Sequence, residues 1–370
     1  MALVLGRLLA AVVVAGTVGC ERRHPVVIGF AFGGEHPGVL DVVHAEFALR
    51  PGERETEILS ATGFIAETGA PGQVRVATRF AAIPGLVGVV GHADSRGTLV
   101  AVPVYHEAHI PVLVPTATSR RLRAVSPWVF TLAPDDSAEA EFIADFAVRS
   151  LRTHAAAVFY DNDDYGIGLR NALRTAFAGR GVRLIAEEPI AGACGPPEIG
   201  EGSILLATPR ARPPDLVVIA GRTRDAACIA RRLVARVTGI RVIGADGVEP
   251  DTAFYDRLGS ATPTFYFVAF WYPGAPGTAS ADFARRFERL VARPPHASEA
   301  LLFDAVMLLA LASREAGTRH EAVRRYLSEL GGTRPAYQGV TGSISFGPSA
   351  RRPLYMLQAG ARGQQPVMVP

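Results

Sequence analysis

The chain has 370 residues and a formal net charge of +3, and 49% of its residues are hydrophobic while 20% are charged. This length exceeds what one hydrophobic core usually supports, so we expect two domains, and the composition excludes an intrinsically disordered chain. All 38 basic residues are Arg, and they form neither a long basic stripe nor a known reading motif. These observations argue against a nucleic-acid partner.

The N-terminal segment 1–20 has the layout of a secretory signal peptide. One Arg precedes an apolar run over 8–18, which is too short to span a bilayer comfortably. Cys20 follows the small Gly19 at the end of this run and resembles the lipid-attachment cysteine of bacterial lipoproteins. We therefore expect an exported, periplasmic or extracytoplasmic protein that is tethered to the membrane only by a lipid anchor. An ordinary signal peptide is the alternative.

Beyond the signal, Cys194 and Cys228 are the remaining cysteines. Disulfides persist in exported proteins, so this pair forms one bridge or stays as two separate thiols. The sequence leaves both alternatives open.

Short apolar runs alternate with amphipathic stretches along the chain, a pattern typical of repeated βαβ units. The predicted strands cover residues 26–32, 85–91, 110–115, 155–160, 215–220, 240–246 and 264–272.

Periodicity predicts two helices, and the C-terminal tail is marked by the lack of it. Leu169, Leu173 and Phe177 recur every four residues and predict a helix that ends at Gly181. The segment 299–313 is apolar nearly all round, which indicates a deeply buried helix. The tail 359–370 has no periodicity, so we expect it to be loose.

The segment "IPVLVPTATS" (110–119) changes character halfway. Its first half predicts a buried strand, and its second half, rich in hydroxyl side chains, predicts the capped start of a helix. Small polar ligands bind where strands of an open α/β sheet end, and free N–H groups at a helix start favour an anion. The alternative is a capped loop that binds nothing.

Two long and two short segments carry a resemblance to a known family. The long ones are "IPGLVGVVGHADSRGTLVAVPVYHEAHIPVLVPTATS" (83–119) and "DNDDYGIGL" (161–169); the short ones are "RVIGADGV" (241–248) and "FDAVMLLA" (303–310). Over nearly all of the chain beyond the signal, the sequence resembles the periplasmic Leu/Ile/Val-binding protein family. These are the extracytoplasmic receptors of branched-chain amino acid ABC transporters.

The resemblance implies an α/β fold of two Rossmann-like lobes joined by three crossovers, the type I periplasmic binding protein fold. The crossovers would lie near Pro134, Phe267 and Phe346. The predicted domains are the signal peptide 1–20 with lipoprotein Cys20, lobe I over 25–135 plus 268–346, and lobe II over 136–267 plus 347–370.

The resemblance also implies a carboxylate site on lobe I. Ser95 and Thr118 match the two hydroxyls that bind the carboxylate of an amino acid, Thr116 matches a residue with main-chain contacts, and Ala117 belongs to the same site. The chemistry agrees independently, because neutral hydroxyl donors bind a carboxylate without a buried cation. Ser95 and Thr118 as simple helix caps are the alternative.

On lobe II the resemblance implies three further ligand-binding residues. Tyr165 matches an aromatic residue that closes over the ligand, and Asp246 matches an acid that pairs with the ligand ammonium, directly or through a water. A turn Asp that bonds its own backbone is the alternative for Asp246.

Arg222 stands where the family usually has an aromatic residue. It either pairs with Asp225 or Asp246, or offers a bidentate fork to a second carboxylate on the ligand. The second alternative would favour an acidic or more polar ligand.

The chain has no G-x-S-x-G elbow, no P-loop and no H-E-x-x-H motif, so we expect no enzyme, no cofactor, no catalytic residue and no metal site. The leading hypothesis is a solute-binding lipoprotein of an ABC transporter that binds an amino acid, branched-chain or related, and delivers it to a membrane permease. The alternative is a lipoprotein of the same fold that acts on a partner protein or as a sensor, for example an activator of an envelope enzyme.

Overall fold

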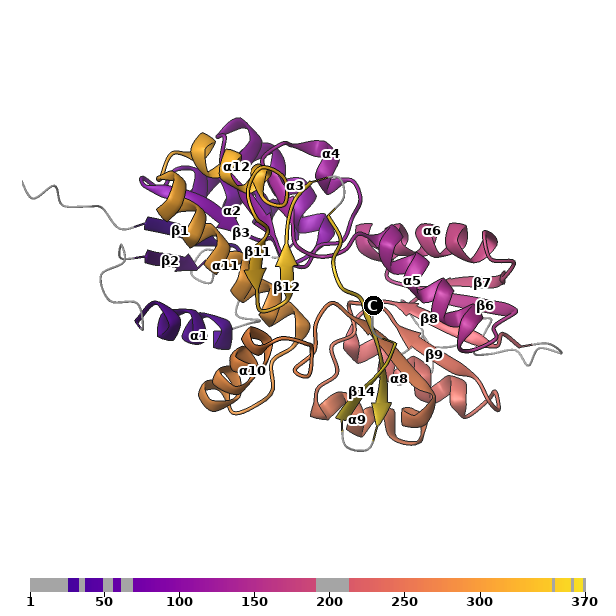
Figure 1. Ribbon diagram of the computed structural model, residues 1–370. Coiled ribbons are helices and arrows are strands. Elements are labelled where there is room, and N and C mark those ends of the chain that lie inside the picture. The colour runs from indigo at the N-terminus through magenta and orange to yellow at the C-terminus, as the bar shows by residue number, and fades with distance from the viewer. Residues whose placement is uncertain are drawn as a thin grey trace, which may run out of the picture.

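The computed structural model describes residues 26–32, 37–48, 56–60, 69–190, 213–347, 350–360 and 363–368. The chain forms two α/β lobes, each built around its own sheet (Figure 1). We call the lobe around the five-stranded sheet the first lobe and the lobe around the seven-stranded sheet the second lobe. The predicted α/β class is confirmed.

The first lobe has a parallel sheet in the order β2-β1-β3-β4-β5. Its strands are rich in Val, Leu and Ile, and β1, β3, β4 and β5 are buried along their whole length, as expected for a parallel sheet covered on both faces. The strands are β1 Val26–Phe30, β2 Thr56–Ser60, β3 Leu86–Val90, β4 Val112–Val114 and β5 Val129–Thr131.

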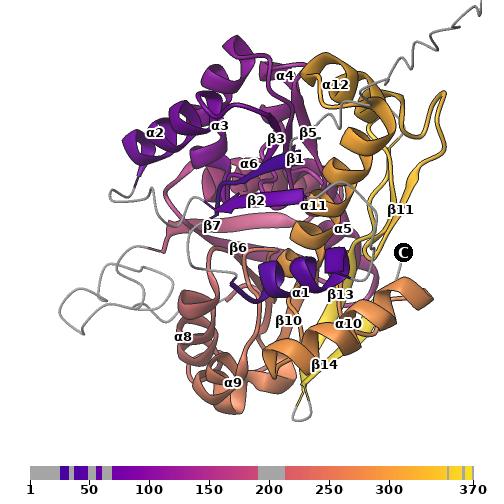
Figure 2. The ribbon, with the colours of Figure 1, turned by 90° about the vertical axis from the view of Figure 1, so that its left-hand side faces the viewer.

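Helices from both ends of the chain cover this sheet (Figure 2). The longest, α11 Ala297–Ala316, packs against β1, β3 and β4, which confirms the predicted buried helix. The others are α1 Pro37–Ala48, α2 Ala70–Ala81, α3 Ser95–Glu107, α4 Leu122–Val125, α10 Thr278–Val291 and α12 His320–Glu329; a ribbon of β11 Tyr337–Gly339 and β12 Gly342–Ile344 follows.

The second lobe has a mixed sheet in the order β14-β13-β10-β9-β8-β6-β7, in which β13 runs antiparallel to both of its neighbours. Its strands are β6 Ala155–Tyr160, β7 Arg183–Pro189, β8 Leu216–Ala220, β9 Arg241–Gly244, β10 Phe265–Ala269, β13 Tyr355–Gly360 and β14 Gly363–Met368. Its helices are α5 Asp136–Arg149, α6 Asp164–Ala178, α8 Thr223–Val234 and α9 Thr252–Leu258, followed by the 3-10 helix η3 Gly259–Thr264.

The chain passes between the lobes after β5, after β10 and after β12. Because parallel strands end at one edge of each sheet, these passages place the loops that follow β3, β4, β6, β8 and β9 at the junction of the lobes.

The predictions for the C-terminal tail and for the end of one helix are wrong. The tail is not loose: β14 pairs antiparallel with β13, from Met356 opposite Met368 to Gly360 opposite Gly363. An edge strand is held by main-chain hydrogen bonds and can have exposed polar side chains, so it needs no apolar periodicity. Helix α6 ends at Ala178 and not at Gly181, which adopts φ +72° in the following turn.

The predicted signal peptide, Cys20 and Cys194 lie outside the described residues. Cys228 is disulfide-bonded, and neither of the other two cysteines lies in the described part of the chain. Within the described ranges, no helix is both long and apolar enough to cross a bilayer.

Candidate functional site

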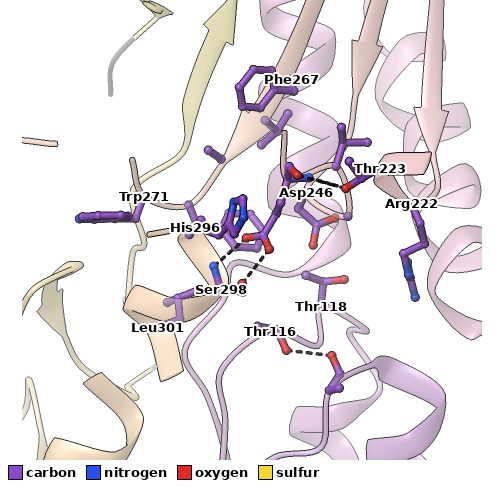
Figure 3. A pocket seen from close by; sticks show the side chains of 18 of the residues that line it. Thr116, Thr118, Arg222, Thr223, Asp246, Phe267, Trp271, His296, Ser298 and Leu301 are labelled. Carbon is purple, nitrogen blue, oxygen red and sulfur yellow. Dashed lines mark hydrogen bonds between the residues drawn. The ribbon is translucent and has the colours of Figure 1, made fainter. Parts of the chain in front are cut away.

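A cavity of about 560 Å³ lies between the two lobes (Figure 3). The first lobe contributes the loops after β3 and β4 and the start of α11, and the second lobe contributes the loops after β6, β8 and β9. All the predicted ligand-binding residues line this cavity: Ser95, Thr116, Ala117, Thr118, Tyr165, Arg222 and Asp246.

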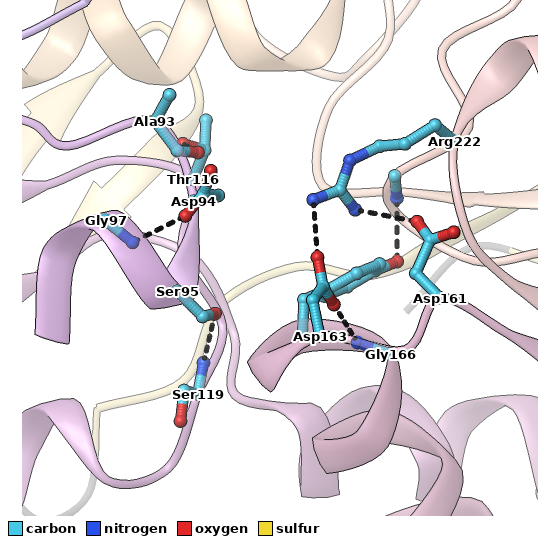
Figure 4. Close-up of polar contacts among 12 residues, drawn as sticks. Ala93, Asp94, Ser95, Gly97, Thr116, Ser119, Asp161, Asp163, Gly166 and Arg222 are labelled. Carbon is cyan, nitrogen blue, oxygen red and sulfur yellow. Dashed lines mark hydrogen bonds and ion pairs between the residues drawn. The ribbon is translucent and has the colours of Figure 1, made fainter. Parts of the chain in front are cut away.

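The two first-lobe loops are hydrogen-bonded to each other (Figure 4). Thr116 Oγ1 donates to the Ala93 carbonyl at 2.8 Å, and the Ser119 N–H donates to Ser95 Oγ at 3.3 Å. Ser95 is therefore not the cap of its helix. That role belongs to Asp94, whose carboxylate accepts from the Gly97 N–H at 2.6 Å.

Thr118 presents an unused hydroxyl to the cavity. Its side chain is 2% exposed, and among the described residues Oγ1 makes no hydrogen bond of normal geometry, although it lies close enough to the Asp136 carboxyl to lower the pKa of that group. A buried hydroxyl without a partner destabilises a fold by about 1–3 kcal/mol, so a ligand oxygen bound there would restore this loss.

The predicted helix start over Thr116–Ser119 is wrong. These residues form a loop, and the next helix, α4, begins only at Leu122, with Arg121 at its N-cap and no side-chain capping bond. The hydroxyl groups bind the neighbouring loop or face the cavity, which is why they cap nothing.

On the second lobe, α6 begins at the end of strand β6 and places Tyr165 against the cavity. Asp163 caps α6 by accepting from the Gly166 N–H at 2.8 Å. The Tyr165 hydroxyl donates to Asp246 Oδ1 at 2.6 Å and accepts from the Gly247 N–H at 3.1 Å. Tyr165 thus fixes the loop that carries Asp246 and has no hydroxyl proton left for a ligand.

Asp246 belongs to a cluster of three carboxyl groups with Glu139 and Asp136, at the start of α5. The Asp246 N–H donates to Glu139 Oε1 at 2.9 Å, and the two carboxyl groups lie close enough to shift each other's pKa. Burial, together with the charge of Asp246, raises the pKa of Glu139 well above its usual range. Of these two carboxyl groups, only that of Asp246 lines the cavity.

The other two members of this cluster also have raised pKa values. Burial raises the pKa of Asp246, while hydrogen bonds from Tyr165 and Glu139 oppose this effect. The pKa of Asp136, which is 2% exposed, is raised to about 7, chiefly by burial, with the Thr118 hydroxyl lowering it and the charge of Asp246 raising it. Asp136 and Glu139 thus lie behind the cavity wall, and Asp246 is the member of the cluster that reaches the ligand space.

Arg222 forms ion pairs with two carboxylates of the protein (Figure 4). Its guanidinium lies 3.8 Å from Asp161 Oδ2 and 3.7 Å from Asp163 Oδ2, and it stacks over the Tyr165 ring at 4.6 Å from the ring centroid. The predicted partners Asp225 and Asp246 are not its ion-pair partners among the described residues. The structure therefore favours pairing over a free fork for a ligand carboxylate.

The remaining lining is mainly apolar. Phe267, Trp271 and Leu301 are part of this lining (Figure 3), and the Trp271 indole is directed towards α10, where its N–H donates to Ser280 Oγ at 2.8 Å.

Sequence reasoning missed one polar pair in the cavity. The Glu249 carboxylate of the second lobe accepts from the Ser298 N–H and from the Ser298 hydroxyl of the first lobe, each at 2.7 Å. Glu249 follows Asp246 by three residues at the same strand end, and this spacing was the available signal. Ser298 had no comparable signal, because it reaches the cavity only through the junction of the lobes.

Comparison with known proteins identifies the family. The family model described as "Periplasmic binding protein" matches residues 69–364. The chain belongs to the periplasmic binding protein family. This is a family of non-enzymatic solute-binding proteins, and it implies an extracytoplasmic location.

Two curated relatives match parts of this periplasmic binding protein. An amino acid binding protein of Pseudomonas aeruginosa is 29% identical over 182 residues, which is 48% of this chain and 46% of the relative. A Leu/Ile/Val-binding protein of Rhizobium johnstonii is 24% identical over 238 residues, 63% of this chain and 62% of the relative. The matched regions therefore span less than two thirds of each relative.

Solved structures confirm the two-lobed fold. A leucine-binding protein of Thermotoga maritima has a TM-score of 0.79 at 20% identity, with 93% of this chain and 98% of that one covered. An isoleucine complex from Streptococcus pneumoniae has a TM-score of 0.79 at 19% identity, with 94% and 100% covered. A benzoate complex from Rhodopseudomonas palustris has a TM-score of 0.76 at 14% identity, with 94% and 96% covered.

Proposed function

We propose that this protein is the solute receptor of an ABC transporter, that it binds an α-amino acid in the interlobe cavity, and that it delivers the ligand to a membrane permease. The observation that carries the proposal is the opposition of two groups across one cavity. The Thr118 hydroxyl is buried and makes no hydrogen bond of normal geometry to the described residues, and the Asp246 carboxyl lies on the wall that the other lobe contributes. The first group takes the ligand carboxylate, and the second takes the ammonium.

Asp246 favours an amino acid over a simple aromatic acid. The structural relatives include one bound to isoleucine and one bound to benzoate. Benzoate has no amine, so it would leave the Asp246 charge buried and unpaired, which is costly. An α-amino acid supplies the missing cation, and the apolar lining around Trp271 and Leu301 accommodates the carbon skeleton of its side chain.

Contacts between the lobes support a receptor that closes on its ligand. Glu249 of the second lobe binds Ser298 of the first, and Arg121 Nη1 lies 3.3 Å from Asp164 Oδ1. A ligand that contacts both walls favours the closed form, because only that form offers both sets of contacts. The closed form would dock the permease, and a lipid on Cys20 would keep the receptor at the membrane.

A thermal-shift screen against the standard amino acids and benzoate tests this function. A ligand at 100 to 1,000 times its Kd stabilises the folded form by about 3–4 kcal/mol. Hits confined to amino acids are the expected result. A screen in which benzoate alone stabilises the protein would contradict the role of Asp246. A screen without any hit would favour the alternative of a partner-binding module.

Substitutions of Thr118 test the proposed carboxylate site more directly than the ligand screen does. Thr118→Val removes the hydroxyl at nearly constant volume, so the affinity for any amino acid that hits should fall by about 1.5–3 kcal/mol, the value of a hydrogen bond to a charged group. Thr118→Ser keeps the hydroxyl and should retain affinity in calorimetric titrations. Equal affinities in the two variants would show that the carboxylate binds elsewhere.

A further inference from the structure

Glu249 places a second acid in the ligand cavity, beside Asp246 on the loop after β9. The backbone of this residue is clamped, because its N–H donates to Thr223 Oγ1 at 2.9 Å and its carbonyl accepts from the same hydroxyl at 3.3 Å. Since the main chain is fixed in this way, the carboxylate is held in the cavity instead of turning out to solvent.

The carboxylate of Glu249 has acceptor capacity to spare. Ser298, the second residue of α11, donates its N–H to Oε1 and its hydroxyl to Oε2, each at 2.7 Å. The N–H is one of the first-turn donors that a helix leaves without an internal partner, which stabilises the negative charge. An ionised carboxylate accepts about four hydrogen bonds, so Ser298 uses only part of this capacity.

The arginines around the cavity are already paired with other acids. Arg222 lies between Asp161 and Asp163, and Arg293 donates to both carboxylate oxygens of Glu299 at 2.8 and 2.6 Å. In the described part of the chain, no Arg forms an ion pair with Asp246 or Glu249. The cavity therefore has two carboxylates without a direct ion pair among the described residues, although the charge of Arg222 acts on Asp246 and that of Arg293 lies near Glu249.

An amino acid with an aliphatic side chain would match only one of these two acids. Its carboxylate would meet the Thr118 hydroxyl, which is buried and makes no hydrogen bond of normal geometry to the described residues, and its α-ammonium would meet Asp246. The free acceptor positions of Glu249 would then face CH groups, and the desolvation of a charged group without a partner is unfavourable. A second positive charge on the ligand would remove this penalty, and a cavity of about 560 Å³ has room for a long side chain.

We infer that Glu249 determines specificity and selects an amino acid whose side chain ends in an amine or a guanidinium. This inference rests on the proposed amino acid site and names its ligand class. It also predicts that glutamate is excluded, because Glu249 would repel a second carboxylate.

Calorimetric titrations with lysine, arginine, leucine and glutamate test this inference on the wild-type protein and on Glu249→Gln. Gln keeps an oxygen that accepts from the Ser298 N–H, so the variant removes the charge while it retains a contact between the lobes. We expect wild-type protein to bind lysine or arginine at least about tenfold more tightly than leucine, and Glu249→Gln to lose this preference. Glu107→Gln, the same change on an exposed residue outside the cavity, should leave all affinities unchanged.

The outcomes separate this inference from the proposed function. Tight leucine binding with weak lysine and arginine binding would overturn the role of Glu249 and leave the amino acid site intact. An equal loss of affinity for all ligands in Glu249→Gln would also overturn it, because Glu249 would then act only as a contact between the lobes. Wild-type protein that binds none of the four amino acids would overturn this inference, and only the absence of any hit in the full amino acid screen would overturn the proposed function as well.

Discussion

The two walls of the cavity use different chemistry. The first-lobe wall faces the ligand with neutral groups, chiefly the Thr118 hydroxyl and the two loops held together by Thr116, and its one acid, Asp94, is engaged as the cap of α3. The second-lobe wall is charged, with Asp246 and Glu249 on one loop and Arg222 at its margin. One wall can therefore bind an anion without a buried cation, and the other can bind a cation.

This difference indicates which residues should make the stability of the protein depend on pH. The first-lobe residues that line the cavity include the hydroxyl groups of Ser95, Thr118 and Ser298, which do not titrate near neutral pH, and also His296. Behind the second-lobe wall, Asp136 and Glu139 are buried carboxyl groups whose pKa values are raised by desolvation. Substitutions of Asp136 or Glu139 should therefore change the dependence of stability on pH most directly.

Asp136→Asn should have the largest effect on stability. The pKa of Asp136 is about 7 in the folded protein against an ordinary value of 3.8, so between these pH values the folded state holds a proton that the unfolded state has lost. Its contribution to stability is fully present below about pH 4 and is lost as pH rises to about 7, by as much as about 4 kcal/mol. Asn resembles the protonated acid, so the variant should be more stable than wild type at pH 8.

Urea unfolding at pH 5 and pH 8 measures this effect as a difference between wild type and variant. Glu107→Gln is the matched control, because it makes the same carboxyl-to-amide change on an exposed residue outside the cavity and should keep the wild-type dependence of stability on pH. A wild-type pH dependence in Asp136→Asn would show that this carboxyl is ionised in the folded protein.

Asp246→Asn should have the largest effect on ligand affinity. Asn can still accept a hydrogen bond from the Tyr165 hydroxyl, so the loop should stay in place while the charge opposite the ligand ammonium disappears. Removing one partner of a buried charge pair weakens binding by about 2–5 kcal/mol. Titration with the tightest amino acid from the screen measures the loss; unchanged affinity would place the ammonium elsewhere.

Arg222→Gln should have a smaller effect. Both of its ion pairs are longer than hydrogen bonds, and its side chain is 42% exposed, so we expect a loss of about 1 kcal/mol or less in stability and little change in amino acid affinity. Thermal unfolding and a titration with glutamate check this result. A glutamate affinity that wild type has and the variant lacks would restore the alternative of Arg222 as a fork for a second carboxylate.

The sequence was sufficient to bring the site residues together. Buried apolar runs define parallel strands, and the ends of parallel strands meet at one edge, so Ser95, Thr118, Tyr165 and Asp246 had to lie near the same junction. The partners of Arg222 follow the same rule. Asp161 and Asp163 come after β6 and Arg222 after β8, and these two strands are neighbours in the sheet.

Other contacts depend on features that a linear pattern does not contain. Glu249 and Ser298 meet across the lobes, so their contact requires the position of one lobe relative to the other. The hydroxyls of the loop after β4 resembled helix caps because their alternative partner, the Ala93 carbonyl, lies on a different loop. Strand β14 was missed because its pairing with β13 is a main-chain interaction that leaves little trace in side-chain character.

Arg121→Ala should have the smallest effect, although it removes a contact that joins the two walls. The Arg121 side chain is 69% exposed and that of its partner Asp164 is 36% exposed, so water and salt screen the pair. We expect a change in stability of at most about 1 kcal/mol and an affinity close to that of wild type. An affinity loss as large as that of Asp246→Asn would mean that closure depends on this exposed pair, and the division between a neutral wall and a charged wall would then fail to account for binding.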